Sequence, residues 1–271
     1  MPEAMLRIEQ TASVLRLTLN RPDQRNALSR DLVDALHSAL DSAAPDVRVI
    51  VLTGEGSAFS AGADLASLQA MQTATAEENL DDSRALSDLF QTIRTHRCPV
   101  IARVNGAAIG GGCGLVAACD LAVCADDAKL GFPEVRLGFV PAIVLPFVVR
   151  KVGEGRAREL LLLGGRFTAE QALTAGFVTR VVPSDRLDEV VDKMAVELVT
   201  KTSATALSLT KQLFHVTDGL APDAAARHAT LANAFARSTS DFGAGLASFL
   251  GKTDPPWRAS STSTTDDESN R

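Results

Sequence analysis

Two glycine-rich segments carry backbone groups that can stabilise a negatively charged oxygen. Residues 60–64 read Ser-Ala-Gly-Ala-Asp, and residues 110–114 read Gly-Gly-Gly-Cys-Gly. The second segment lies between two apolar runs, which predicts a strand, a tight turn and the start of a helix. The N–H groups at a helix start are unpaired and carry a partial positive charge, and glycine allows a ligand to approach them closely. These segments therefore indicate oxyanion stabilisation during chemistry at a carbonyl.

The two best-known glycine-rich phosphate sites do not fit these segments. A dinucleotide site needs Gly-x-Gly-x-x-Gly and an acidic residue about 20 positions later, and a phosphate-binding loop ends in Gly-Lys-Ser or Gly-Lys-Thr. Neither pattern is present. A glycine triplet alone also fits a flexible turn, so the hypothesis of an oxyanion site depends on both segments together.

Glu134 is the acidic residue that we single out near these segments. A glutamate is ordinarily a solvated surface charge. If Glu134 is partly buried, its carboxylate becomes a candidate for proton transfer, because poised carboxylates mark active sites.

The elements that must position these residues follow an alternating pattern. Apolar strands are predicted at 6–10, 14–20, 47–52, 100–104 and 121–124, with helices after Ser29, around 86–93 and at 115–119. Strands that alternate with helices and are apolar throughout predict an α/β core with both faces of the sheet covered. The polar interval 73–82 reads as a mobile connection.

The C-terminal part has a different character. Helices dominate from residue 170 onward, and residues 200–257 are predicted to be all-helical, with apolar side chains suited to packing against another element or subunit. The last residues are rich in Ser, Thr and acids, which predicts a disordered tail.

Composition narrows the class of protein further. The chain has 271 residues, 46% hydrophobic and 4% aromatic, and a net charge of −6. This acidic balance argues against nucleic-acid binding, and no apolar stretch approaches the roughly 20 residues that cross a bilayer. The N-terminus lacks a signal-peptide pattern, so we expect a cytoplasmic protein without membrane or nucleic-acid partners.

The cysteines do not form a recognisable metal motif. Cys98, Cys113, Cys119 and Cys124 contain no Cys-x-x-Cys pair and no interleaved histidine, so they are predicted to be free, buried thiols. Cys113 lies within the second glycine segment, where a nucleophile is conceivable, although the sequence shows no histidine partner for it.

Several ordered motifs resemble the enoyl-CoA hydratase/isomerase, or crotonase, superfamily over about residues 5–257. They are Asn20-Arg-Pro, Asn26-Ala-Leu, the segment 54–65, the segment 105–114, Cys119-Asp, and Phe132-Pro-Glu-Val-Arg-Leu-Gly. The resemblance implies an α/β fold, a crotonase-type spiral of ββα units at 1–199. It further implies a helical trimerisation region at 200–257 and leaves 258–271 as the disordered tail. It also implies a homotrimer or a dimer of trimers (hexamer).

The resemblance assigns roles to individual residues. The N–H groups of Ala63 and Gly111 would form the oxyanion hole around the thioester oxygen of an acyl-CoA, with Glu134 as the catalytic acid or base. The positions that would bind coenzyme A are Arg25, Ala27, Ala61, Asp64, Leu65, Phe249 and Lys252. In some relatives the last two contact a neighbouring subunit's ligand; the alternatives are a core position for Phe249 and a surface charge for Lys252. No metal and no cofactor are implied, since coenzyme A is part of the substrate.

This chain departs from the two-glutamate pattern of typical hydratases. Gly114 stands where those enzymes carry their first glutamate, which leaves Glu134 as a lone carboxylate. Three activities remain open: an enoyl-CoA hydratase (a carbon–oxygen lyase), a Δ3,Δ2-enoyl-CoA isomerase, and a catalytically weak acyl-CoA-binding homologue.

The stretches 119–123, 134–153 and 249–257 most resemble the methylglutaconyl-CoA/isohexenylglutaconyl-CoA hydratase-like branch, in which glycine is frequent at that first glutamate position. The family places such enzymes in fatty acid or branched-chain amino acid catabolism. A carboxylated substrate would need a cation nearby, and Arg84, Arg136 and Arg158 are candidates by presence alone.

Overall fold

The computed structural model describes residues 4–259 of the chain. The chain divides into two compact units, one up to Asp192 and one from Lys193 onward. This division falls within helix α7 (Leu187–Lys201), close to the predicted boundary between 199 and 200. Most of the predicted tail, residues 260–271, lies outside the described residues.

A six-stranded sheet forms the centre of the first unit. Its strands follow the order β1 (Leu6–Thr11), β2 (Val14–Leu19), β3 (Val49–Gly54), β5 (Val100–Val104), β7 (Leu121–Ala125) and β10 (Arg180–Val182). Strands β1 and β2 form an antiparallel hairpin, and the other neighbouring pairs are parallel. Every residue of β3 is buried, as expected for a parallel sheet with both faces covered.

A second, smaller sheet contains four very short strands. These are β4 (Ala58–Ser60), β6 (Ala107–Ile109), β8 (Lys129–Gly131) and β9 (Arg166–Thr168). Strands β4, β6 and β8 each follow a strand of the large sheet along the chain, so two strands and the following helix recur as a unit. The mixed α/β fold expected from the family resemblance is therefore confirmed.

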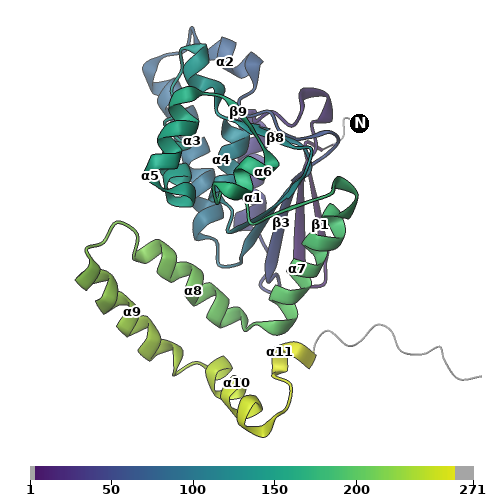
Figure 1. Cartoon of the computed structure of the whole chain (residues 1–271), viewed down its shortest axis with the longest axis vertical. Coiled ribbons are helices and arrows are strands. Elements are labelled where there is room, and N and C mark those ends of the chain that lie inside the picture. Colours follow the sequence, from purple (N-terminus) through teal and green to yellow (C-terminus); the bar gives the residue numbers. More distant parts are fainter. Residues whose placement is uncertain (1–3, 260–271) are drawn as a thin grey trace, which may run out of the picture. The chain divides into compact units, whose positions relative to one another are not determined.

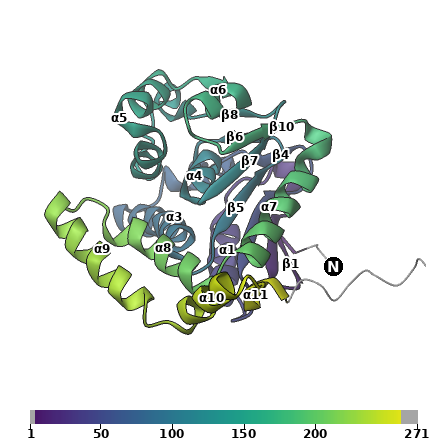
Figure 2. The ribbon, with the colours of Figure 1, turned by 60° about the horizontal axis from the view of Figure 1, so that its bottom comes forward.

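Helices connect successive strands of the first unit along the chain. They are α1 (Arg30–Asp41), α2 (Leu65–Met71), α3 (Ala76–Thr95), α4 (Gly111–Ala118), α5 (Leu145–Leu163) and α6 (Ala169–Thr174). Short 3-10 turns η1 (Pro22–Gln24), η2 (Pro133–Leu137) and η3 (Ser184–Arg186) connect these elements. Helix α3 packs against α1 and α4, and α4 packs against α5 (Figures 1 and 2).

One local prediction was wrong. The interval 73–82, predicted as a mobile connection, contains the first two turns of α3. A capping box starts this helix: the Glu78 N–H donates to the Thr75 hydroxyl, and the Thr75 N–H donates to the Glu78 carboxylate at 2.7 Å. The polar residues that read as a loop are therefore the cap and the solvated face of a helix.

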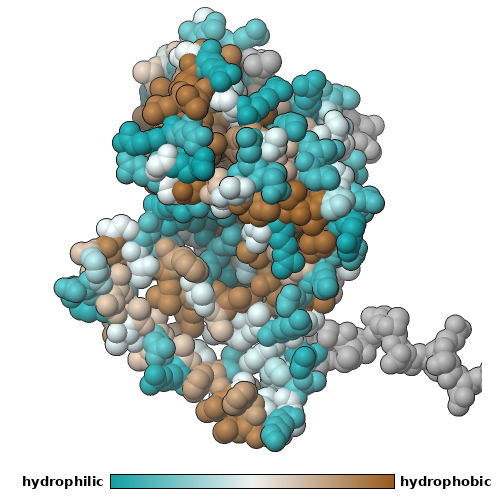
Figure 3. All heavy atoms as spheres, in the orientation of Figure 1, coloured by the Kyte–Doolittle hydropathy of each residue, from teal (hydrophilic) through white to brown (hydrophobic). Residues whose placement is uncertain are grey.

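The second unit is helical, as the sequence predicts. It contains the end of α7 followed by α8 (Ala204–Val216), α9 (Pro222–Ala236), α10 (Ser240–Gly251) and α11 (Pro256–Ala259). Several large apolar side chains are exposed on it: Phe214, Leu231, Phe235, Phe242, Leu246, Phe249 and Leu250. Figure 3 shows hydrophobic side chains gathered over α10. Among the helices of residues 4–259, none combines the length and apolar character that a membrane span requires.

Candidate active site

A buried polar network holds the first glycine segment in place. The Asn26 side chain is fully buried, and its Nδ2 donates to the carbonyl oxygens of Ala58 at 2.8 Å and Glu55 at 2.9 Å. The Ser60 hydroxyl donates to the Asn26 carbonyl at 2.8 Å and accepts the Gly62 N–H at 3.2 Å. These bonds fix the backbone of residues 60–64. Sequence reasoning assigned no role to Asn26, although it is the first residue of the Asn26-Ala-Leu motif.

The two glycine segments touch through their backbones. A Cβ atom on Gly62 would lie 3.1 Å from the Gly111 nitrogen, and one on Gly112 would lie 2.4 Å from the Ser60 carbonyl oxygen. Side chains at these positions would therefore separate the segments. Gly62 also has a φ of +82°, which favours glycine. Because Ala63 follows Gly62 directly, the backbones at Ala63 and Gly111 are neighbours.

Hydrogen bonds to the adjoining carbonyl groups orient the two predicted N–H donors. The Gly62 carbonyl accepts the Leu28 N–H at 2.7 Å, and the N–H of a trans peptide points opposite to its carbonyl. The Ala63 N–H therefore points away from Leu28. The Gly110 carbonyl likewise accepts the Gly114 N–H at 3.0 Å, so the Gly111 N–H points out of the N-terminus of α4.

Glu134 stands beside the start of α4. A Cβ atom on Gly110 would lie 2.9 Å from Glu134 Oε1. The other carboxylate oxygen, Oε2, is buried and has no hydrogen-bond partner in the described part of the chain. Phe132, fully buried against Phe167 and Phe177, anchors the chain just before this residue. The structure thus brings Glu134 to the same helix start as Gly111 and its neighbour Ala63.

Burial changes the acidity of this carboxyl group. Desolvation raises the pKa of Glu134 above its ordinary value of 4.5, and a hydrogen bond from its own main-chain N–H opposes this less strongly. A carboxyl group whose pKa is raised toward neutral pH is better suited to both accept and return a proton.

The position of the missing glutamate is occupied by other side chains. A Cβ atom on Gly114 would lie 2.6 Å from ring carbons of Phe90 and 2.7 Å from Val144 Cγ1. Gly114 and Phe90 are buried, and Val144 is only 3% exposed. The sequence shows only that a carboxylate is absent. The structure shows that apolar groups from α3 and the start of α5 fill its place.

Four of the predicted CoA-binding residues lie within or next to the first glycine segment. The Arg25 carbonyl accepts the Ala61 N–H at 2.8 Å, and the Ala27 carbonyl accepts a hydrogen bond from Arg21. Arg21 also pairs with Asp64 at 3.0 Å, while Asp64 caps α2 through two main-chain N–H groups. The Asp64 carboxylate is therefore engaged within the fold, and its backbone is the part left to contact a ligand.

The remaining predicted CoA-binding residues are more scattered. Leu65 is the first residue of α2. Phe249 and Lys252 belong to the second unit, where Phe249 is 81% exposed and Lys252 ends α10 in a left-handed conformation. Phe249 is thus not a core residue of the single chain. A role for these residues in binding coenzyme A stays a prediction.

The cysteines have no catalytic geometry. All four cysteines are buried and none of them forms a disulfide, as predicted. The Cys113 thiol donates to the Ala108 carbonyl at 2.9 Å, and burial strongly raises its pKa. Because the thiolate is the nucleophile, a protonated Cys113 does not fit that role. No group of three metal-binding side chains occurs among the residues that the structure describes.

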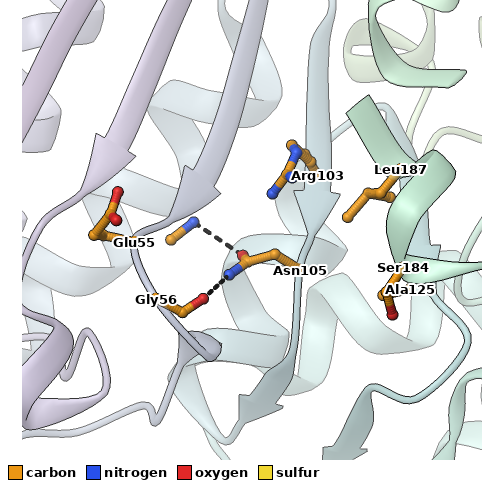
Figure 4. A pocket seen from close by; sticks show the side chains of 8 residues that line it. Glu55, Gly56, Arg103, Asn105, Ala125, Ser184 and Leu187 are labelled. Carbon is orange, nitrogen blue, oxygen red and sulfur yellow. Dashed lines mark hydrogen bonds between the residues drawn. The ribbon is translucent and has the colours of Figure 1, made fainter. Parts of the chain in front are cut away.

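A separate cavity of about 310 Å³ lies at the carboxyl edge of the large sheet. Its lining consists of Gly54, Glu55, Gly56, Arg103, Asn105, Ala125, Ser184 and Leu187 (Figure 4). The Asn105 side chain accepts the Gly54 N–H at 3.2 Å and donates to the Gly56 carbonyl at 2.9 Å. Arg103 is paired with Asp188. None of the predicted site residues lines this cavity, and Asn105 acts there as a brace for the connection from β3 to β4.

Comparisons with known proteins identify relatives of this chain. The family described as enoyl-CoA hydratase/isomerase matches residues 9–260. A "Putative enoyl-CoA hydratase" of Thermus thermophilus is 43% identical over 93% of this chain and 99% of its own length. The 2,3-dehydroadipyl-CoA hydratase of Escherichia coli is 35% identical over 93% of this chain and 97% of its length.

Solved structures support the same relationship. An enoyl-CoA hydratase from Mycobacterium smegmatis superposes with a TM-score of 0.89 at 32% identity, covering 94% of this chain and 99% of that one. The chain therefore belongs to the enoyl-CoA hydratase/isomerase (crotonase) superfamily.

We expect Asn26→Ala to destabilise the fold around the first glycine segment. The change removes the Asn26 donor to the Ala58 and Glu55 carbonyls and the acceptor of the Arg21 N–H, at about 1–3 kcal/mol for a buried group left unsatisfied. Urea denaturation would measure the loss. The partly exposed Asn79 on α3 provides the control, since Asn79→Ala should shift the midpoint far less. Equal midpoints for the two variants would contradict a structural role for Asn26.

Glu134→Gln should stabilise the chain in a pH-dependent way. The folded-state pKa lies above the ordinary 4.5, so folded chains hold this proton more tightly, and ionisation costs stability as the pH rises through the folded-state pKa. The variant should therefore melt higher than the original protein at neutral pH, and the difference should vanish below pH 4.5. Melting curves across pH would test this, with the exposed Glu9→Gln as control. A lower melting temperature for Glu134→Gln at neutral pH would show that the carboxylate is not desolvated.

Proposed function

We propose that this chain is an enoyl-CoA hydratase, a carbon–oxygen lyase that adds water to the C2=C3 double bond of a 2-enoyl-CoA thioester. Membership of the family supports the general reaction. The observation that carries the assignment is the buried, unpartnered oxygen of Glu134 beside the start of α4. A carboxylate in that state binds a water molecule or a substrate proton without first giving up a partner within the protein.

The proposed mechanism uses one carboxylate and two backbone donors. The Ala63 and Gly111 N–H groups bind the thioester oxygen. Glu134 takes a proton from water as the water oxygen bonds to C3, and the electrons of the double bond move onto the thioester oxygen as an enolate. The protonated Glu134 then returns that proton to C2, which completes the addition of one water. Each N–H donor contributes about 3–4 kcal/mol when such a hole is well formed.

The proposed substrate contacts extend from this centre. Coenzyme A would lie against Arg25, Ala27 and the segment 61–65, and it would need no additional cofactor. Phe249 and Lys252 would contact its nucleotide end, from the same subunit or from a neighbour in a homotrimer or dimer of trimers. The exposed apolar side chains of the second unit support such an assembly, because apolar patches mark interfaces.

A second candidate function is a Δ3,Δ2-enoyl-CoA isomerase. The space beside Gly114 is filled by Phe90 and Val144, so no second carboxylate can stand there to hold water. One carboxylate suffices for isomerisation: Glu134 would take a proton from C2 of a 3-enoyl thioester and return it to C4, moving the double bond to C2=C3. The proposed hydratase-like branch, with its carboxylated substrates, is compatible with either reaction.

The three arginines differ in their availability to a carboxylated acyl group. Arg84 pairs with Asp81 at 3.2 Å, and Arg158 pairs with Glu154 at 2.7 Å. Arg136 lies on η2 near Glu134, and its Nε donates to a main-chain carbonyl at 2.9 Å. Arg136 is therefore the candidate of the three that we retain.

Glu134→Gln should lower turnover by about 10²–10⁴-fold, the usual contribution of a general acid–base. Binding of a saturated acyl-CoA should persist, because the glutamine keeps the shape of the side chain. Assays with 2-enoyl and 3-enoyl thioesters would separate the two functions, since only hydration consumes the conjugated double bond.

In the unsubstituted protein, kcat/KM should fall as the pH drops through the raised pKa of Glu134, because the carboxylate must be ionised to accept a proton. Measuring kcat/KM across pH would test this.

The matched control is Glu154→Gln, which removes an exposed carboxylate and should leave turnover unchanged. Full activity of Glu134→Gln would refute the proposed role. Tight binding of thioesters without any turnover in the original protein would indicate the acyl-CoA-binding homologue instead.

A further inference from the structure

The apolar groups over Gly114 belong to a larger contact between α3 and α4. Leu86 and Phe90 are four residues apart on α3, so they lie on one face of that helix. Leu86 Cδ2 would lie 4.0 Å from a Cβ on Gly111, and the Phe90 ring 2.6 Å from a Cβ on Gly114. One face of α3 therefore covers α4 from the oxyanion donor Gly111 to the position of the missing glutamate.

The Phe90 ring has little freedom to move away from this position. It is fully buried and meets Phe147 edge to face, with ring centroids 5.5 Å apart and an interplanar angle of 82°. Val144 closes the same space from the start of α5. Protein interiors are packed densely, so inserting a new group beside an enclosed side chain lowers the stability of the fold.

This apolar cluster is close to the proposed proton-transfer group. Glu134 lies against Gly110, and Phe90 lies against Gly114, one helical turn further along α4. One turn of helix corresponds to a rise of about 5–6 Å. Glu134 and the Phe90 ring therefore contact α4 about one helical turn apart.

We propose that Phe90 is a specificity-determining residue that keeps this site to a single carboxylate and thereby limits addition of water relative to movement of the double bond. Its ring occupies the volume in which a second acid would hold the attacking water. The inference rests on the proposed function, because it concerns how the same site divides its substrate between two reactions. Gly114 and Phe90 together exclude a second carboxylate: Gly114 provides no acid, and the Phe90 ring fills the space that the acid would need.

Four variants test this proposal: Gly114→Glu, Phe90→Ala, the double variant of both, and Leu89→Ala combined with Gly114→Glu as control. Leu89 is as fully buried as Phe90 on the same helix, but the atoms nearest to the Gly114 position belong to Phe90 and Val144. We expect Gly114→Glu alone to lower the melting temperature, because its side chain has no space. Phe90→Ala should recover much of that loss in the double variant, whereas Leu89→Ala should not.

The activity of each variant is measured as two rates: hydration of a 2-enoyl thioester and isomerisation of a 3-enoyl thioester. The ratio of the first rate to the second is then compared between variants. A second acid–base group contributes about 10²–10⁴-fold, so the ratio of hydration to isomerisation should rise at least about tenfold from Phe90→Ala to the double variant. A change in stability alone would not move this ratio.

Two results would overturn the proposal. One is a Gly114→Glu variant that is as stable as the unsubstituted protein. The other is a double variant whose ratio of hydration to isomerisation equals that of Phe90→Ala. Failure of the proposed function is distinguishable from these. If the original protein converts neither thioester, the enzymatic assignment fails and Phe90 determines no specificity, while the melting temperatures still show whether its ring fills the volume beside Gly114.

Discussion

The main chain of residues 60–64 directly contacts the start of α4, and the candidate site depends on this contact. Backbones approach so closely only where side chains are absent, and Cβ atoms on Gly62 or Gly112 would overlap the opposite segment. The buried Asn26 and the Ser60 hydroxyl satisfy the polar groups that this approach buries. Each segment alone is an ordinary turn, and only their contact makes the backbones of Ala63 and Gly111 neighbours.

Electrostatics at this point involve two opposing effects on Glu134. Burial raises the pKa of this carboxyl group, whereas a hydrogen bond from its own main-chain N–H lowers it. The pKa of Glu134 is raised, so burial is the larger effect. The ionised Glu134 carboxylate therefore reduces the stability of the folded chain. Such a conflict is typical of sites where proton transfer matters more than stability.

Sequence reasoning located the parts of the site that local chemistry determines. The glycine segments and Glu134 stand out from their residue types alone, whereas Gly114 is singled out only by the family resemblance. The short strands of the small sheet were not predicted from periodicity, because three residues show no alternation. The start of α3 was missed because the capping box from Thr75 to Glu78 consists of polar residues that also suit a loop. The contact between Phe90 and Gly114 joins two helices, and no spacing within either one reveals it.

The loss of a carboxylate at position 114 is consequently a property of the packed core as well as of one residue. A glycine leaves space, but here Phe90 and Val144 close that space, and Phe147 packs against Phe90. Residues in direct contact do not contribute independently to stability, so the effect of a side chain at 114 depends on the residue at 90. A chain with glycine at 114 and a small residue at 90 would have room for water near Glu134. The identity of residue 90 therefore carries information about the reaction that residue 114 alone does not.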